Sequence, residues 1–401
     1  MGEVFTIERG GSPRPIEDYI TNNVNGINWI KIGDTKNVIK YIYETKEKIK
    51  PEGIKKSRMV YEGDFILSNS MSFGKPFIMK TTGCIHDGWL VIRKNELLDN
   101  NYLFYILSSS FVFKQFSNLA KGSTVKNLNI DDVKQVEIRF PPLVEQQLIV
   151  SKIEQLFSEL ENGKQQLETA QQQLKVYRQS LLKWAFEGKL TNKNVKEGEL
   201  PKGWKWVKLG EVCSSVEYGS ATKSKKTGSI PVLRMGNIQN GIFDWNDLVF
   251  TDNDAEIKKY LLKKNDVLFN RTNSAEWVGK TAIYKGERPA IFAGYLIRIN
   301  RIESLIDASY LTYFLNTHFA KSYGNTVRSF GVNQSNINGT KLKTYPIPLP
   351  TIEEQHLIVQ ELESKLTICD KIEETITNSL QQAETLRQSI LKKAFEGRLI
   401  N

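Results

Sequence analysis

The sequence predicts an α+β protein with a pseudo-twofold internal repeat: two similar α/β domains separated by two long helices that form an antiparallel intramolecular coiled coil. Three observations lead to this fold class. The segment RQSLLKWAFEGKL, from Arg178, returns as RQSILKKAFEGRL, from Arg387, after a shift of 209 residues. The residues before each copy follow a heptad pattern, and the remaining sequence contains short β-type runs broken by Gly, Asn and Pro.

The composition indicates which kind of molecule the protein binds. The 401 residues carry a net charge of +10, and such an excess of Lys and Arg favours an anionic partner, usually nucleic acid. A generally basic surface is the alternative. The three cysteines are too few and too scattered for a disulfide framework. No signal segment or membrane-spanning run is present, so we expect a cytoplasmic protein without a membrane partner.

The repeat defines the domain boundaries. The same shift aligns VEQQLIV at 144–150 with EEQHLIV at 353–359, and weaker matches pair 102–107 with 310–315. We therefore predict a first domain, a first long helix, a linker, a second domain and a second long helix, at residues 1–140, 141–190, 191–203, 204–347 and 348–401.

The heptad pattern predicts one buried stripe on each long helix. In the first copy the stripe comprises Ile149, Ile153, Leu156, Leu160, Gly163, Leu167, Ala170, Leu174, Tyr177, Leu181 and Trp184. In the second it comprises Ile358, Leu362, Leu366, Cys369, Ile372, Ile376, Ala383, Leu386 and Ile390. A helix of about 45 residues spans about 65–70 Å. A partner helix from another chain would also cover the stripe, but equal lengths favour pairing within the chain.

The ends of both helices carry recognisable signals. Prolines at 141–142 and 348–350 end the preceding strand-like runs. Thr351 and Glu354 have the spacing of a capping box at the start of the second helix. Gly188 and Gly397 lie where each helix would end in a left-handed residue.

The two domains contain mixed strands interrupted by helices. Strand-like runs are 29–32, 89–92, 232–235 and 295–298, and helical stretches lie near 100–118 and 308–322. Within the strand-like runs, Trp29, Trp89 and Tyr295 are expected in the core rather than as stacking platforms.

No catalytic constellation is complete. Residues 278–281 (VGKT) resemble the end of a phosphate-binding loop, but Ser274 occupies the place of the required upstream glycine. The three histidines, His86, His318 and His356, are dispersed, which argues against a zinc site or a histidine-based triad. We expect a non-catalytic chain that itself holds no cofactor and no metal.

With these residues in view, the chain resembles the specificity (S) subunit of a type I restriction–modification enzyme. The resemblance covers nearly the whole chain. It rests on the duplicated RQS-[LI]-LK-x-AFEG-[KR]-L, on the helix starts PP-x-x-EQ and P-x-x-EEQ, and on KGSTVKNL at 121–128. The second copy departs from the last motif and reads RSFGVNQ at 328–334.

This resemblance implies the function. Each domain would be a target-recognition domain that reads one half of a bipartite, asymmetric site in double-stranded DNA, and the helices would set the gap between the halves. The helices would also dock two modification subunits, which bind S-adenosylmethionine and methylate adenine. Two restriction subunits would add an ATP- and Mg²⁺-dependent nuclease.

Candidate DNA contacts are Lys, Arg, Asn, Gln and small hydroxyl residues, because these types meet phosphates and base edges. In the first domain they are Lys31, Ser70, Lys75, Lys121, Ser123, Thr124 and Lys126. In the second they are Arg234, Asn237, Arg271, Asn273, Lys280, Arg328, Asn333 and Gln334. For each residue, a merely solvated surface position is the alternative.

Two other functions fit the same pattern. A free-standing DNA-binding regulator with a coiled-coil spacer would bind its site without partners. A pure scaffold would use its basic charge for solubility, and its DNA binding would not depend on sequence.

Overall fold

The computed structural model describes residues 1–69, 73–93, 95–120, 127–192, 194–330 and 334–399. Contacts divide the chain into two compact units. Unit 1 comprises Met1–Glu168 and Thr377–Asn401, and unit 2 comprises Thr169–Ile376. Among the described residues, no helix is long and apolar enough to cross a membrane.

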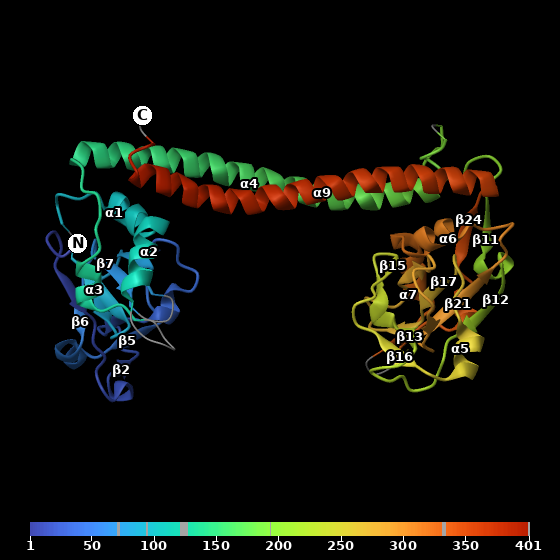
Figure 1. The fold of residues 1–401 in the computed structure, drawn as a ribbon, viewed down its shortest axis with the longest axis horizontal. Coiled ribbons are helices and arrows are strands. Elements are labelled where there is room, and N and C mark those ends of the chain that lie inside the picture. The colour runs from blue at the N-terminus through green and yellow to red at the C-terminus, as the bar shows by residue number, and fades with distance from the viewer. Residues whose placement is uncertain (70–72, 94, 121–126, 193, 331–333, 400–401) are drawn as a thin grey trace. The chain divides into compact units, whose positions relative to one another are not determined.

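Unit 1 contains two five-stranded sheets (Figure 1). The first has the order β1-β10-β7-β8-β4, with bounds Ile7–Arg9, Trp89–Ile92, Phe65–Ser68, Pro76–Met79 and Tyr41–Ile42. The second has the order β2-β5-β3-β9-β6, with bounds Ile20–Thr21, Glu47–Ile49, Ile27–Ile30, Gly83–Ile85 and Arg58–Val60. The 3₁₀ helices η1, η2 and η3 span Ile16–Asp18, Ile32–Thr35 and Pro51–Lys56.

Three short helices, α1 (Asn100–Leu107), α2 (Ser110–Leu119) and α3 (Ile130–Lys134), complete the domain in unit 1. Asp99 caps α1, since its carboxylate accepts from the amides of Asn101 and Tyr102. Buried side chains of the first sheet, α1 and α2 form one core with the adjoining ends of the two long helices.

Unit 2 repeats this architecture with smaller sheets. A four-stranded sheet has the order β12-β21-β17-β19, with bounds Cys213–Tyr218, Leu296–Arg301, Val267–Asn270 and Thr281–Ile283. A three-stranded sheet has the order β16-β13-β20, with bounds Val249–Thr251, Ile230–Leu233 and Ile291–Phe292. A second three-stranded sheet, β18-β23-β22, spans Thr272–Asn273, Ser335–Asn336 and Ser329–Phe330.

The remaining elements of unit 2 are short. Two strand pairs are β14–β15 (Ile238–Gln239 and Ile242–Phe243) and β11–β24 (Lys205–Lys208 and Pro346–Leu349). Helices α5 to α8 span Asp254–Tyr260, Ala308–Leu315, His318–Val327 and Gly339–Leu342, and the 3₁₀ helices η4 and η5 span Leu209–Glu211 and Met235–Asn237.

Strand β24 is the strand-like run that contains Pro348, at the edge of its two-stranded sheet. The corresponding run before Pro141, residues 136–140, forms no strand. The prediction of a strand-like run before each helix is therefore right for the second helix and wrong for the first.

Strand pairing confirms that the two domains are copies. In unit 1, β10 lies between β1 and β7, antiparallel to both, as β21 lies between β12 and β17 in unit 2. Each domain also contains one parallel pair in its other sheet, β3 with β9 and β13 with β20. The connecting loops differ in length, so the two domains do not align at one constant shift.

The long helices α4 (Leu143–Phe186) and α9 (Ile352–Phe395) each contain 44 residues. In unit 1 the first part of α4 lies beside the last part of α9, and in unit 2 the last part of α4 lies beside the first part of α9 (Figure 1). The two helices therefore run antiparallel. The predicted fold class, an α+β chain with an internally paired antiparallel coiled coil, is confirmed.

Two arginines at equivalent positions of the repeat form different contacts between α4 and α9 in the two units. In unit 2, Arg178 of α4 donates to Asp370 and Glu373 of α9 at 2.7 and 3.0 Å. In unit 1, the guanidinium of Arg387 lies 4.2 Å from the ring centroid of Phe157. The same sequence position thus forms an ion pair in one unit and a cation–π contact in the other.

The predicted stripe is wrong at four positions. Tyr177, Trp184, Ile372 and Leu386 are exposed, whereas Leu174 and Leu181 are buried. Beyond Leu174 the covered face of α4 passes through half-buried Arg178 instead of Tyr177. An α-helix turns every 3.6 residues, so a strict heptad stripe drifts away from the contact unless the helices supercoil along it.

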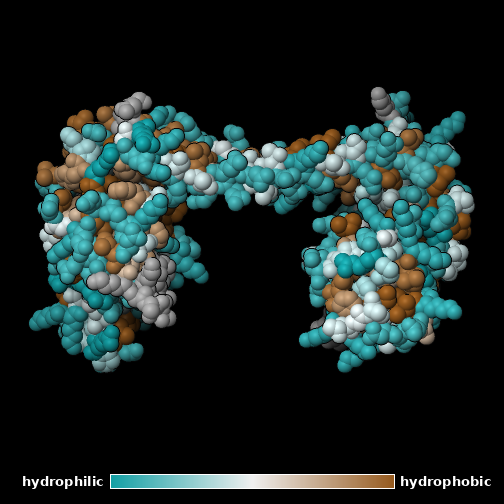
Figure 2. All heavy atoms as spheres, viewed as in Figure 1, coloured by the Kyte–Doolittle hydropathy of each residue, from teal (hydrophilic) through white to brown (hydrophobic). Residues whose placement is uncertain are grey.

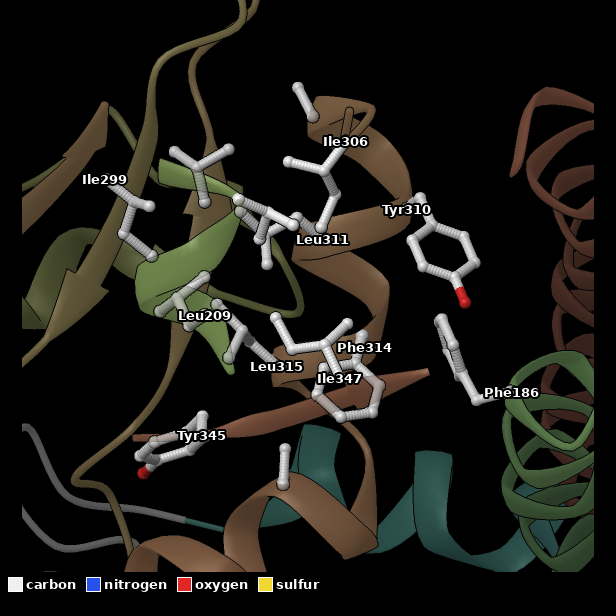
Figure 3. Packing of buried hydrophobic residues seen from close by; sticks show 14 of the residues in the cluster. Phe186, Leu209, Ile299, Ile306, Tyr310, Leu311, Phe314, Leu315, Tyr345 and Ile347 are labelled. Carbon is white, nitrogen blue, oxygen red and sulfur yellow. The ribbon is translucent and has the colours of Figure 1, made fainter. Parts of the chain in front are cut away.

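The repeated helix end carries a phenylalanine that packs on α1 or α6. Phe186, at the end of α4, lies 5.0 Å from the ring of Tyr310 and 5.3 Å from that of Phe314, between centroids (Figure 3). Phe395, at the end of α9, lies 5.5 Å from the ring of Tyr102. Each long helix therefore begins after one domain and ends against the other copy.

Two buried glutamines fix the other ends of the helices. Gln146 accepts from the Asp99 amide at 2.8 Å, and Gln355 accepts from the Asp307 amide at 2.8 Å. Both side chains are fully buried, and both amides also donate to backbone carbonyls. Since Asp99 and Asp307 cap α1 and α6, each glutamine joins a long helix to the first turn of a domain helix.

The predicted helix-end signals are largely confirmed. Gly188 and Gly397 have φ of 75° and 76°, and each follows the last turn in a Schellman arrangement. The Thr351 hydroxyl accepts from the Glu354 amide at 3.3 Å, as a capping box requires. The Glu354 carboxylate, however, accepts from Thr191 and Asn192 of the linker and from Trp204, the first residue of the second domain, instead of closing the box.

Candidate nucleic-acid interface

Lys31 and Arg234 occupy equivalent places in the two domains. Each follows the strand of the parallel pair, β3 or β13, and immediately precedes a 3₁₀ helix. The Lys31 amide donates to Asp34, and the Arg234 amide donates to Asn237, both at 2.9 Å. The backbone of both cationic residues is therefore fixed in the same way, although the sequences around them differ.

A carboxylate holds each of these cationic side chains. Lys31 forms an ion pair with Glu47. Arg234 forms one with Asp247 at 2.9 Å and also donates to the Asp247 carbonyl at 3.0 Å. The two cationic side chains remain 37% and 36% exposed, so each is oriented by its partner and still accessible to an anion.

Asn237 does not lie at the surface. Its side chain is 3% exposed, and its amide donates to the carbonyls of Asp244 and Asp247 at 3.0 Å each. The structure therefore places this candidate contact inside the loop, where it supports Arg234. Its spacing after Arg234 could have revealed this role, because an Asn three residues beyond a cap residue commonly bonds back to it.

Lys75 and Lys280 form a second equivalent pair. Each immediately follows a glycine of positive φ, Gly74 at 79° and Gly279 at 92°, in the connection between two antiparallel strands. The carbonyls of Lys75 and Lys280 accept from Ser68 and Asn270, at 3.2 and 2.8 Å. Lys75 is exposed, and Lys280 is half-buried.

Arg271 lies beside exposed aromatic side chains. Its guanidinium lies 4.7 Å from the Tyr218 ring centroid, and it donates to the Gly294 carbonyl at 3.2 Å. Asn69 takes the equivalent place in the first domain. It is buried, and its side-chain amide donates to the Asp87 carbonyl at 3.0 Å. This position therefore differs in chemistry between two otherwise matching frameworks.

Three further candidates lie around the β18-β23-β22 sheet. Asn273 is paired with Ser335 in the ladder, and its side chain accepts from the Ser274 amide at 2.8 Å. Arg328 immediately precedes β22 and donates to the Ala275 carbonyl at 3.0 Å. Gln334 is exposed just before β23. The structure thus gathers these three candidates near residues 271–280.

The other six candidates are Ser70, Lys121, Ser123, Thr124, Lys126 and Asn333, and they lie outside the described residues. Among the aromatic residues, Trp29 and Trp89 are buried as expected. Tyr295 was expected in the core but is 50% exposed, because it precedes β21 rather than lying within it. Sequence reasoning also missed the exposed rings of Tyr218 and Trp277, which no periodic pattern marks.

A groove of about 610 Å³ lies beside Lys31, lined by residues 12–17, Trp29 and His86. Both ring nitrogens of His86 face backbone donors: the Gly88 amide at 2.7 Å and the Ile32 amide at 3.1 Å. Burial lowers the pKa of His86 below 6.5, and Lys31 lowers it further, against the opposing effect of Asp87. The ring of neutral His86 can accept at only one nitrogen, so it accepts from one of these two amides beside Lys31.

Two copies of a cation-bearing α/β domain, each fixed to paired long helices, define a duplicated nucleic-acid-recognition protein. The family model of the type I restriction modification DNA specificity domain matches residues 1–169 and 201–382. The chain belongs to this family, whose members are the non-catalytic DNA-recognition subunits of type I restriction–modification systems.

Curated relatives agree with this assignment. The chain is 28% identical over 314 residues to the EcoKI specificity subunit of Escherichia coli K12, covering 77% of this chain and 68% of that one. It is 30% identical over 312 residues to the StySPI specificity subunit of Salmonella potsdam, covering 77% and 67%.

Solved structures share the fold. The HsdS subunit of Thermoanaerobacter tengcongensis matches with a TM-score of 0.66 and 21% identity, covering 99% of this chain and 95% of that one. A chain from a study of complex assembly and conformational transition in a type I restriction–modification system matches with a TM-score of 0.70 and 21% identity, covering 98% of both.

Proposed function

We propose that each domain reads one half of a bipartite DNA site and that the paired helices set the gap between the halves. The observation that carries this proposal is the repeated placement of two cationic residues, Lys31 with Lys75 and Arg234 with Lys280, on equivalent frames of two divergent domains. Two domains that read different DNA sequences would keep the loops that contact the DNA phosphates and would differ in the residues that contact the bases.

The side chains suit different parts of DNA. Arg234 and Arg271 present planar guanidiniums, and within the described part of the chain their buried Nε atoms have no hydrogen-bond partner. A planar guanidinium can bond both acceptors on the major-groove edge of guanine. Lys75 and Lys280 carry compact ammonium groups, which suit phosphates. We therefore assign base reading in unit 2 chiefly to the two arginines, and contacts with the DNA backbone to Lys75 in unit 1 and Lys280 in unit 2.

Methyl transfer and cleavage would belong to partner subunits. In the described part of the chain, no group of three His, Cys, Asp or Glu side chains is placed to hold a metal ion. We propose that two modification subunits hold S-adenosylmethionine, and that restriction subunits hold ATP and Mg²⁺. This chain would recognise the DNA sequence and hold the partner subunits on its long helices.

The helix surface in unit 2 offers a docking site for a modification subunit. Hydrophobic residues are exposed among hydrophilic ones along the helices (Figure 2). They include Val176, Tyr177 and Trp184 of α4 and Ile368 and Ile372 of α9. The rings of Tyr177 and Trp184 lie 6.4 Å apart, edge to face, on the exposed side of α4. Exposed apolar side chains of this kind are typical of an interface with another protein.

The decisive experiment is co-expression of this chain with a candidate modification subunit from the same genome, followed by methylation-aware sequencing of the host DNA. Deleting the chain should abolish N6-methyladenine at one bipartite motif. Exchanging residues 204–347 for those of a relative should change one half of that motif only. Methylation that persists without the chain would disprove the proposal. Tight, sequence-specific binding by the chain alone, without methylation, would instead support a free-standing regulator.

A further inference from the structure

An exposed tryptophan stands in the connection between β18 and β19 in unit 2. Trp277 is 45% exposed, although it lies in a domain whose other large side chains are mostly buried. It is part of residues 274–280, the segment that ends in Lys280 and that Arg328 contacts from beside β22.

Hydrogen bonds with Asn270, Thr281 and Arg328 fix the backbone of this segment. The buried side-chain amide of Asn270 donates to the Trp277 carbonyl at 3.2 Å, and the backbone carbonyl of Asn270 accepts from the Gly279 amide at 2.8 Å. The buried Thr281 hydroxyl donates to the Gly279 carbonyl at 3.2 Å, and Arg328 donates to that of Ala275. The loop therefore holds Trp277 outward on a fixed support, which lowers the entropy cost of binding through this residue.

A cation accompanies the exposed ring. The Lys280 ammonium lies 3.9 Å from the Trp277 ring centroid and donates to Gln239 at 3.3 Å. Partial burial lowers the pKa of Lys280, and nearby Lys321 lowers it further, whereas Glu276 opposes both effects. An approaching phosphate would offset the unfavourable environment of this ammonium.

The exposed Trp277 ring together with nearby cations favours DNA as the binding partner of this loop. An apolar ring alone would suit another protein, but here Lys280, Lys321 and Arg328 lie around the same loop. In DNA, a flat base lies next to a phosphate, so a ring with an adjacent cation matches both groups at once. Aromatic and apolar side chains that enter DNA separate neighbouring bases and bend the duplex.

We infer that Trp277 enters the half-site read by unit 2 and stacks on a base, while Lys280 binds the adjacent phosphate. This inference rests on the proposed DNA-reading function and assigns a distorting residue to it. The equivalent connection in unit 1 differs, since Phe73, just before Gly74, stacks on Phe113 with ring centroids 5.8 Å apart. The two domains would therefore deform their half-sites differently.

The test uses the full chain with its modification subunit and a duplex that contains the motif found by sequencing. 2-Aminopurine, which fluoresces when unstacked, replaces one base at a time across the second half-site. A base that the modification subunit takes out of the stack for methylation should fluoresce in both complexes. The wild-type complex should raise the fluorescence at one further position, next to the base on which Trp277 stacks, and Trp277→Ala should abolish this second rise alone. Affinity should fall by roughly tenfold in Trp277→Ala, as expected for the loss of one base–aromatic stack, and partly recover in Trp277→Phe.

Trp206 supplies a matched control, because it is an exposed tryptophan of the same unit that packs against Phe319. Trp206→Ala should leave both readouts unchanged. An unchanged 2-aminopurine signal in Trp277→Ala would overturn the inference, as would loss of the modification subunit from that variant. If the wild-type complex showed no sequence-specific binding, the proposed function itself would fail, which is a separate outcome.

Discussion

At the residue scale, the buried Gln146 and Gln355 each join a long helix to the domain helix beside it. Replacing Gln355 by Leu would leave the Asp307 amide and two backbone carbonyls without their partner. We expect unit 2 to lose about 2–4 kcal/mol of stability, because buried unpaired polar groups cost about 1–3 kcal/mol each. Hydrogen exchange of residues 305–312 should accelerate. Gln360→Leu, at an exposed position of the same helix, should leave exchange unchanged.

His86 should make the stability of unit 1 depend on pH. Its pKa is lowered in the folded state, so the unfolded chain binds a proton first as the pH falls. The free energy of unfolding should therefore be unaffected above pH 6.5 and decrease as the pH falls below it. Urea unfolding of wild type and His86→Gln between pH 7.5 and 5 checks this expectation. Parallel pH profiles for the two proteins would contradict it.

Residue roles were only partly predictable from the sequence. The cationic side chains at 31, 75, 234 and 280 follow from residue type and loop position. The equivalence of Lys31 with Arg234 and of Lys75 with Lys280 could not be predicted, because these pairs are 203 and 205 residues apart instead of the 209 of the helix repeat. The burial of Asn237 and the exposure of Tyr295 depend on where a strand ends, which a short run of residues does not determine.

At the scale of elements, the helix ends permit a matched comparison. Gly188 and Gly397 share a left-handed φ, so alanine should cost about 1 kcal/mol at either site. A Cβ on Gly188 would also lie 2.2 Å from Pro201 Cγ, whereas one on Gly397 would meet only the flexible Arg139 side chain at 2.8 Å. Gly188→Ala should therefore lower the melting temperature of its unit more than Gly397→Ala. Equal shifts would contradict this explanation.

The long helices show what periodicity can and cannot predict. Their existence, ends and internal pairing follow from the duplicated motif and the heptad pattern. The exact covered face does not, since Tyr177 and Trp184 fit the pattern and yet are exposed. The sequence likewise suggested a capping box at Glu354, but this carboxylate bonds instead to two donors of the linker and to Trp204.

At the scale of the whole molecule, the charge of +10 should govern how salt affects DNA binding. The logarithm of affinity falls linearly with the logarithm of salt concentration, in proportion to the phosphates contacted. Lys75→Gln and Lys280→Gln should each reduce this slope by about one. Lys175→Gln, on the exposed surface of α4, should not change it. Titrations at several salt concentrations would distinguish specific phosphate contacts from a general charge effect.

The crossing of the chain between units has a consequence for synthesis on the ribosome. Unit 2 is one continuous stretch, Thr169–Ile376, whereas unit 1 needs Thr377–Asn401 to complete its core. Ile149 and Ile153 of unit 1 pack in the same core as Ile390 and Phe395. The second domain to be translated can therefore reach its final packing first, while the first waits, with part of its apolar surface uncovered, until the segment that begins at Thr377 has been synthesised.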